Sequence, residues 1–161
     1  LDRKNVEMLT GHGVFSEAEL HSRYEITLNN YCKTVLIEAH TMVEMARTQI
    51  APAVEAYAAE TARAAAAKKK LDVSLSCAYE TGLVRKLSRL TDSIAEAVEK
   101  LEQALKKAEG LSDIGKESEL IRDEVLASME KLRTFCDEAE TLTARSFWPY
   151  PTYGDLLFGV K

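Results

Sequence analysis

An apolar stripe with helical spacing begins near the start of this chain and constrains its fold more than any other feature. Apolar or small residues recur at steps of four, four and three: Leu20, Tyr24, Leu28, Tyr31, Val35, Ala39, Met42, Ala46, Ile50, Ala53 and Tyr57. Such steps keep side chains on one face of an α-helix, which advances about 3.6 residues per turn. The stripe therefore predicts one long helix, and its apolar face needs other apolar surface to cover it.

The start of this helix is marked by a capping box. Ser16 can accept a hydrogen bond from the free amides of the first turn, and Glu19, three residues later, can reach back to the backbone of Ser16. Phe15 and Leu20 fall at the two positions of a hydrophobic staple. We therefore predict that a helix begins at Ser16.

Pro52 lies inside the stripe. A proline removes one backbone hydrogen bond and clashes with the preceding turn, so we expect a kink between residues 47 and 52 while the helix continues. The alanine-rich run at residues 58–67 has high helix propensity but few large side chains. The sequence leaves open whether this run packs against a neighbour or projects from the body.

Two further stripes follow, and they predict a second and a third long helix. The second stripe runs through Leu83, Leu87, Leu90, Ile94, Val98, Leu101 and Leu105, and it stops at Gly110. The third runs through Ile121, Val125, Met129, Leu132, Cys136, Ala139 and Leu142, with Asp113 or Ser118 as its cap. The short linker at residues 110–115 makes these two helices antiparallel neighbours. The fold expected is all-α, an antiparallel helical bundle of three long helices, the first kinked near Pro52.

The two ends of the chain depart from this pattern. Residues 2–10 can form a short N-terminal helix that ends at Gly11. Residues 147–161 form an extended aromatic C-terminal tail, in which prolines oppose a regular helix and five of the eleven aromatic residues of the chain are found. So much apolar surface is unlike a solvated tail, and we expect it to dock on the bundle or on another chain or domain.

Composition restricts the class of protein. A length of 161 residues suits one domain, and a formal charge of −5 argues against a nucleic-acid footprint spread over the surface. The run Lys68, Lys69 and Lys70 is typical of the C-terminal end of a helix, where the helix dipole favours positive charge. Cys32 and Cys136, like Cys77, have neither disulfide nor zinc-ribbon spacing, which favours burial and a reducing, cytoplasmic location. We expect no membrane span and no leader segment, although the chain begins at a leucine.

Residues with catalytic potential are present but not grouped. His12, His21 and His40 are the candidate metal ligands, and His21 shares a helix face with Glu17 and Glu25. A helical metal site usually needs such pairs on at least two helices, and the second and third helices contain no histidine. We therefore expect no metal site, although a metal–carboxylate bundle enzyme stays as a third reading.

Phosphate-binding and nucleophilic motifs are also missing. The segment Gly11-His12-Gly13 has no preceding strand to make it a phosphate loop, and the carboxylates alternate with lysines and arginines as on solvated helix faces. Met42 and Met45, like the tyrosines of the first stripe, fit a core or an interface better than a cofactor site. We expect no catalytic, cofactor-binding or metal-binding residue in these 161 residues.

Several strings resemble a known family. Residues 13–26 read Gly-Val-Phe-Ser-Glu-Ala-Glu-Leu-His-Ser-Arg-Tyr-Glu-Ile, and they are followed by Asn30-Tyr31, by Ile37-Glu38-Ala39-His40-Thr41-Met42 and by Gln49-Ile50-Ala51-Pro52-Ala53. Residues 148–158 read Trp-Pro-Tyr-Pro-Thr-Tyr-Gly-Asp-Leu-Leu-Phe. Together these strings resemble the C-terminal region of type III glutamine synthetases, strongly at both ends of the chain and weakly across the middle helices.

The resemblance implies a part of a larger enzyme. Type III glutamine synthetases join ammonia to glutamate with ATP and a divalent metal, Mg or Mn, and the motifs for that chemistry lie upstream of the matching region. The resemblance implies that residues 1–30 are the tail of the catalytic domain, residues 31–146 the helical bundle and residues 147–161 a docking tail. The partners implied are the chain's own upstream catalytic domain and further copies in a homo-oligomer, with no nucleic acid and no membrane.

Two functional hypotheses therefore lead. The first is a non-catalytic domain that supports domain packing or oligomer assembly in a glutamine synthetase; the second is a free-standing helical or coiled-coil interaction module, which the three stripes alone support equally well. In the first, the tail supplies the interface residues, and these are Phe147, Trp148, Tyr150, Tyr153, Leu156, Leu157 and Phe158.

Overall fold

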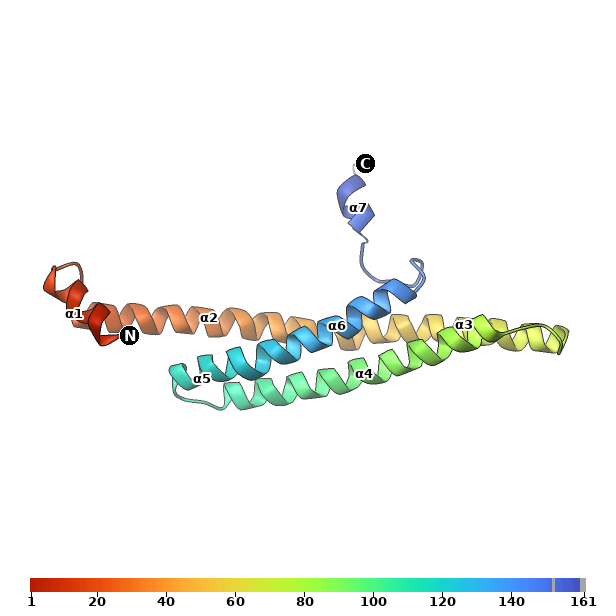
Figure 1. Ribbon diagram of the computed structural model, residues 1–161, viewed down its shortest axis with the longest axis horizontal. Coiled ribbons are helices and arrows are strands. Elements are labelled where there is room, and N and C mark those ends of the chain that lie inside the picture. Colours follow the sequence, from red (N-terminus) through yellow and green to blue (C-terminus); the bar gives the residue numbers. More distant parts are fainter. Residues whose placement is uncertain (152, 160–161) are drawn as a thin grey trace.

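The computed structural model describes residues 1–151 and 153–159, and the regular structure in this part is entirely helical (Figure 1). The expectation of an all-α chain is confirmed. The α-helices are α1 (Arg3–Gly11), α2 (Glu17–Met45), α3 (Ala51–Leu71), α4 (Ala78–Glu109), α5 (Ile114–Leu120), α6 (Leu126–Leu142) and α7 (Tyr153–Phe158). Two π-helical turns lie between them, η1 (Ala46–Ile50) and η2 (Ile121–Val125).

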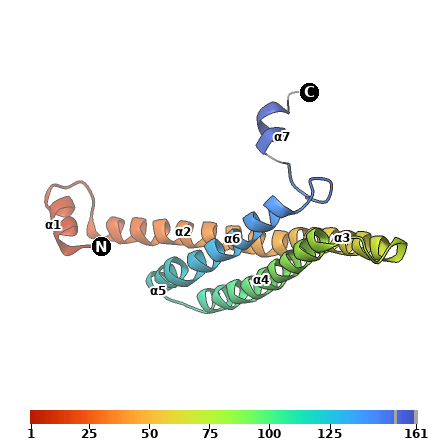
Figure 2. The same cartoon turned by 45° about the vertical axis from the view of Figure 1, so that its right-hand side comes forward.

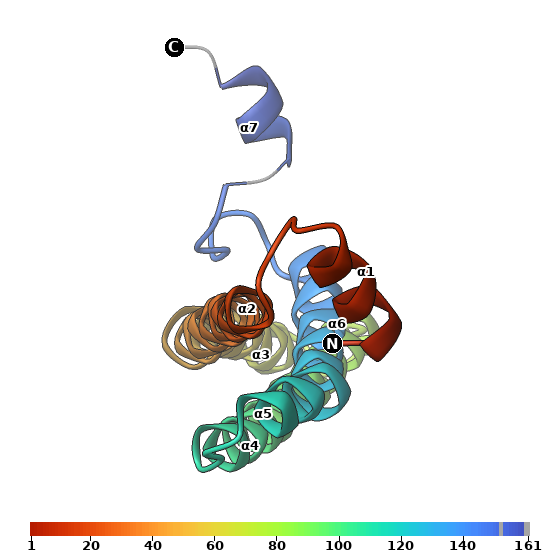
Figure 3. The ribbon, with the colours of Figure 1, turned by 90° about the vertical axis from the view of Figure 1, so that its left-hand side faces the viewer.

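These elements join end to end into three rods. The first rod consists of α2, η1 and α3, the second is α4, and the third consists of α5, η2 and α6. The second rod contacts α3 along one part of its length and α6 along another. Viewed end on, the three rods lie side by side, while α7 stands apart from them (Figure 3).

The turn before the first rod has the capping box expected from the sequence. The Ser16 backbone N–H donates to Glu19 Oε2 at 2.8 Å, and the Glu19 N–H donates to Ser16 Oγ at 3.3 Å. Gly13 has a φ of 65°, a left-handed conformation that other residues rarely adopt, which explains a glycine between α1 and α2. The Arg23 guanidinium lies over the Phe15 ring, 4.7 Å from its centroid.

The core begins well inside the first rod. Cys32 is the first member of the continuous buried cluster, which runs along all three rods. The largest fully buried side chains are Leu87, Ile94, Leu101, Leu105, Ile121, Leu132, Val54, Val125 and Cys32. Before Cys32, Leu20 is the only buried side chain of α2. The N-terminal part of α2 overhangs the second and third rods (Figure 1). We call residues 1–31 the N-terminal arm.

The first rod does not end at Pro52. In the turn just before the proline, the Ala51 N–H donates to the Ala46 carbonyl, five residues back instead of four. A π-turn widens the helix by one residue, and this relieves the crowding that a proline ring causes against the preceding turn. The expected kink at residues 47–52 stays a prediction; the irregularity found there is this wide turn. A second π-turn at Ile121–Val125 occurs without a proline, and the structure offers no sequence cause for it.

The alanine-rich run both packs and projects. Ala58 and Thr61 are buried against α4, and the Cys77 thiol donates to the Ala65 carbonyl at 3.5 Å, so α3 and α4 are in close contact. Beyond this point the α3–α4 hairpin extends past the end of α6, as Figure 1 and the rotated view of Figure 2 both show. Small side chains let two helices approach closely where no third helix covers them.

The third rod is capped by Asp113. Its side chain accepts a hydrogen bond from the Lys116 N–H at 3.0 Å, which decides between the two caps left open by the sequence. Ser118 instead donates to the Gly115 carbonyl at 2.7 Å. The chain turns within four residues between α4 and α5, so these two helices run in opposite directions.

Candidate functional site

The three histidines lie apart from one another. His12 follows α1, His21 lies on the exposed arm, and both are solvent-exposed. His40 is also exposed, and its Nε2 lies 2.8 Å from Glu109 Oε1 at the end of α4. Within residues 1–151 and 153–159, no group of three or more histidine, cysteine, aspartate or glutamate side chains is arranged to hold a metal ion.

Within the described part of the chain, ten of the 26 acidic side chains form ion pairs. One of these pairs joins the first and second rods, where Arg47 donates to both oxygens of Glu102 at 2.8 Å. Lys107 contacts Glu124 at 2.9 Å between the second and third rods. These pairs hold helices in register, since each joins residues that are far apart in sequence.

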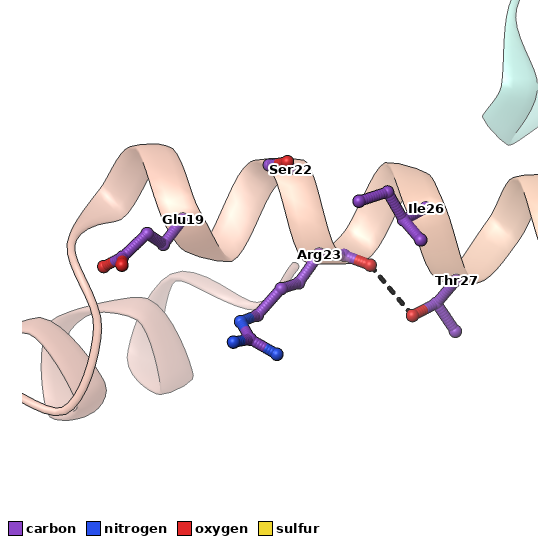
Figure 4. Close-up of a pocket in the computed structure, with 5 residues that line it drawn as sticks. All are labelled: Glu19, Ser22, Arg23, Ile26 and Thr27. Carbon is purple, nitrogen blue, oxygen red and sulfur yellow. Dashed lines mark hydrogen bonds between the residues drawn. The ribbon is translucent and has the colours of Figure 1, made fainter.

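One cavity of about 440 Å³ lies along the N-terminal part of α2, lined by Glu19, Ser22, Arg23, Ile26 and Thr27 (Figure 4). All five residues come from one helix. Thr27 Oγ1 donates to the Arg23 carbonyl at 2.8 Å, and Glu19 is part of the capping box. Because the side chains point along a single open helix face, this hollow belongs to the exposed arm and not to an enclosed site.

The aromatic tail divides into two parts. In its inner part, the Phe147 ring lies 5.3 Å from the Tyr57 ring of α3, and Trp148 and Tyr150 pack on the core with ring centroids 6.3 Å apart. Burial, together with the nearby Cys136, raises the pKa of the Tyr150 hydroxyl. The inner part of the tail therefore contacts the chain's own bundle.

The outer part of the tail leaves the bundle. Helix α7 projects away from the three rods in all three views (Figures 1, 2 and 3), and an ion pair between Arg145 and Asp155 connects it to the end of the third rod. Leu156, Leu157 and Phe158 are 69%, 61% and 82% exposed. The side chain of Tyr153, also expected to dock, lies outside the described residues. Three consecutive apolar side chains are thus uncovered in this chain.

The N-terminal arm is the second apolar surface that this chain leaves open. The large apolar residues exposed there are Leu1, Met8, Val14, Tyr24, Ile26 and Tyr31. Tyr24 and Tyr31 belong to the first stripe, yet they are 40% and 36% exposed, and the N-terminal part of α2 extends beyond the other two rods (Figure 1). A stripe at helical spacing identifies the face that needs cover, but not whether this chain supplies it.

A groove of about 460 Å³ lies between α2 and α6, and it was not foreseen from the sequence. We call it the α2–α6 groove. Its lining is mainly apolar and comes from Ile37, Glu38, Thr41, Met42, Met45, Ala46, Ile50, Met129, Arg133, Cys136 and Asp137. Met42 and Met45 were assigned to a core or interface, and they lie at the boundary between the core and this groove.

The cysteines are buried, as predicted, and unpaired. Burial raises the pKa of the Cys136 thiol to about 11 and also raises that of Cys32. A thiol is nucleophilic only as the thiolate, so Cys136 is inert at neutral pH. The absence of a neighbouring histidine in the sequence was the signal for this structural role.

A fourth surface, also unforeseen, lies at the turn between α3 and α4. Leu71, Val73 and Tyr79 are 84%, 80% and 73% exposed there. The sequence held a signal for it, because large apolar residues directly follow a lysine run in a segment that breaks the helix. That segment was interpreted only as a helix end.

The geometry defines a class of protein: a helical unit whose described residues present open apolar surfaces on the arm, on α7, in the α2–α6 groove and at the α3–α4 turn. None of the helices in the described part is long and apolar enough to span a bilayer. The reactive side chains in this part are paired, buried or dispersed.

Comparisons with known proteins show similarity to one family. Residues 1–69 match the family model of the glutamine synthetase C-terminal domain. The chain is 36% identical over 158 residues to a glutamine synthetase of Butyrivibrio fibrisolvens, covering 98% of this chain and 23% of that protein. It is 25% identical over 159 residues to a type-3 glutamine synthetase of Dictyostelium discoideum, covering 96% of this chain and 22% of that protein. A glutamine synthetase of Bacteroides fragilis is 24% identical over 161 residues, with 98% and 22% covered.

The chain thus matches the C-terminal part of the glutamine synthetase family, type III among them, as the resemblance in the sequence predicted. It spans less than a quarter of the length of these relatives.

Proposed function

We propose that this chain is the non-catalytic C-terminal domain of a type III glutamine synthetase. The whole protein would join ammonia to glutamate with ATP and a divalent metal, Mg or Mn, in the cytoplasm. Within it the three rods would act as an antiparallel bundle that supports domain packing and oligomer assembly. The observation that carries this proposal is the pair of apolar surfaces left open at the two ends of the chain, on the N-terminal arm and on α7.

The N-terminal arm would pack on the upstream catalytic domain. The family match at residues 1–69 contains the whole arm, and the arm includes residues 1–30, assigned above to the tail of that domain. Val14 and Ile26 are each 56% exposed in this chain. Burying large apolar side chains of this kind contributes about 1.5–3 kcal/mol each, so a neighbouring domain would gain stability by covering them.

Helix α7 would be the docking element at the other end. Its inner neighbours Trp148 and Tyr150 fix the tail to the bundle, and the Arg145–Asp155 pair limits where α7 can point. An anchored helix loses less conformational entropy on binding than a free tail does. Leu156, Leu157 and Phe158 would then enter a pocket of the catalytic domain or of a neighbouring subunit.

The test uses the full-length protein encoded by the parent reading frame. Leu157→Asp with Phe158→Asp should lower the oligomeric mass measured by light scattering and reduce glutamine formation, because charge cannot enter an apolar pocket without a large cost. Leu126→Asp introduces the same charge at an apolar residue that is 37% exposed outside these surfaces, and it serves as the control. Unchanged mass and activity in the double variant would refute the docking role of α7.

The alternative of a free-standing interaction module makes a different prediction about the gene. A reading frame that starts a few residues before Leu1 would support the module, and a catalytic domain joined directly upstream would support the ligase. Since the chain matches 22–23% of each relative's length, the ligase is the better supported of the two.

A further inference from the structure

The α3–α4 hairpin concentrates positive charge. Residues 62–89, which we call the hairpin tip, contain seven lysines and arginines but only two acidic residues, a net charge of +5. Since the whole chain has a formal charge of −5, the remaining residues together carry −10. Lys70, Arg85 and Arg89 have no carboxylate partner within residues 1–151 and 153–159. The charge of the chain is therefore strongly separated along its length.

The turn within the tip is internally held by polar contacts. Lys68 pairs with Glu80, a carboxylate that is only 7% exposed, and this pair joins the ends of the two helices. Asp72 Oδ1 accepts a hydrogen bond from the Ser74 N–H at 2.7 Å, which fixes the turn between them. These polar contacts thus order the turn at the end of the tip.

Three apolar side chains near the turn of the tip are exposed, while others in the tip, such as Leu87, belong to the core. Leu71, Val73 and Tyr79 are the most exposed large apolar residues of this segment. A turn that is already ordered presents them without further loss of conformational entropy, which is the property of a preorganised binding surface. Exposed apolar side chains surrounded by basic ones match a partner surface with an apolar centre and an acidic edge.

The α2–α6 groove has that chemistry. Its lining is mainly apolar, and Glu38 and Asp137 lie at its edge together with Arg133, which contacts Asp137 at 3.4 Å. The charged residues that line the groove are two acidic and one basic, a net charge of −1. The groove and the hairpin tip are therefore complementary in both polarity and charge.

Within one copy, Lys86 of the tip pairs with Glu138 of α6, but the exposed apolar residues of the tip do not line the groove. The tip lies at the far end of two continuous helices and points away from the crossing of α2 and α6, as Figures 1 and 2 both show. We propose that the hairpin tip of one copy binds in the α2–α6 groove of a second copy. Each copy has both a tip and a groove, so two copies that exchange tips form a closed pair, whereas a one-way contact builds rings or open chains.

This inference names a contact for the assembly role proposed above and rests on that role only for its biological use. The contact involves residues of this chain alone, so it is tested on the purified chain by analytical ultracentrifugation. We expect association at micromolar to millimolar concentration that weakens as salt is added, because exposed charges attract within a Debye length of about 10 Å at moderate salt.

Two variants separate the two halves of the contact. The tip variant carries Leu71→Ser, Val73→Ser and Tyr79→Ser and keeps an intact groove. The groove variant is Ile37→Asp, which changes a groove residue that is 67% exposed and keeps an intact tip. Each variant alone should bind itself at least tenfold more weakly than the unchanged chain, as expected for the loss of central apolar contacts. An equimolar mixture of the two should regain a one-to-one complex, because one intact tip and one intact groove are then present.

The control variant carries its new charge outside both surfaces. Ile26→Asp introduces the same charge at an exposed apolar residue of the N-terminal arm, and it should associate like the unchanged chain. A monomeric unchanged chain at millimolar concentration, or a mixture that stays monomeric, overturns the inference. Neither result affects the ligase proposal, which depends on the full-length protein and on α7.

Discussion

Arg47 and Glu102 form a two-pronged ion pair that joins the first rod to the second. Arg47 lies in the π-turn just before Pro52, and both of its terminal nitrogens donate to the Glu102 carboxylate of α4 at 2.8 Å. The hydrogen bonds from Arg47 hold the pKa of Glu102 below its ordinary value, while the carboxylate raises the pKa of Arg47. The pair therefore stabilises the bundle where the first helix departs from regular geometry.

The stability that this ion pair contributes should decrease in acid. Because the folded-state pKa of Glu102 is lowered, its contribution to stability is present above the unfolded pKa and is lost as the pH falls through the folded pKa. Glu102→Gln should therefore lower the free energy of unfolding by urea at neutral pH and have little effect in strong acid. Glu60→Gln, which removes a local pair with Arg63 on one helix, is the control and should have the smaller effect at neutral pH. Equal effects of Glu102→Gln at both pH values would contradict the role of the charge.

The buried thiol of Cys136 should lower the free energy of unfolding in alkali. Burial raises the pKa of its thiol from 9.0 to about 11, so the unfolded chain ionises first as the pH rises. Stability should then fall by about 2 kcal/mol between these two values and remain lower above them. Urea unfolding of Cys136→Ala should show a flatter pH dependence over this range. Some slope should remain, because the pKa values of Cys32 and Tyr150 are raised in the same direction.

The two parts of the aromatic tail should respond differently to mutation. Trp148→Ala removes a partly buried ring from the core surface and should destabilise this chain by about 2 kcal/mol in thermal or urea unfolding. Phe158→Ala changes a side chain that is 82% exposed and should alter stability by less than about 0.5 kcal/mol. A large effect of Phe158→Ala on the isolated chain would mean that α7 packs on its own bundle.

The capping box at Ser16 should control local opening of the arm. Ser16→Ala removes the oxygen that accepts from the Glu19 N–H, and the loss of such a cap costs about 1 kcal/mol. Hydrogen exchange at residues 17–20 should become about fivefold faster, while exchange in the core helices stays the same. Ser22→Ala, on the exposed face of the same helix, is the control. Uniformly faster exchange throughout the chain would contradict a local role.

Local signals in the sequence were sufficient for much of the fold. The capping box at Ser16 and the end of α3 after the lysine run depend on neighbours within one or two helical turns. For this reason the helix positions and the buried faces of α4 and α6 could be predicted. The strings at the two ends of the chain were also specific enough to indicate the family.

The open surfaces could not be predicted in the same way. Tyr24 has the same spacing within its stripe as Val35, yet Tyr24 is 40% exposed and Val35 is 7% exposed. The N-terminal part of α2 extends beyond the second and third rods (Figure 1), so those rods leave much of the arm uncovered. How far one rod extends beyond another depends on how the helices pack together. The spacing of apolar residues along a single helix does not predict it.

The sequence by itself determined that this chain is helical and where most helices begin and end, because backbone propensity, capping and periodicity act over a few residues. Its strings of residues also determined which family it resembles. The tertiary structure decided which apolar faces stay open. It placed Leu71 at the tip of a basic hairpin, left the α2–α6 groove uncovered, and separated Trp148, packed on the core, from Phe158, which projects into solvent. These outcomes depend on how rods of unequal length are offset in space, and that offset is fixed only when their side chains pack together.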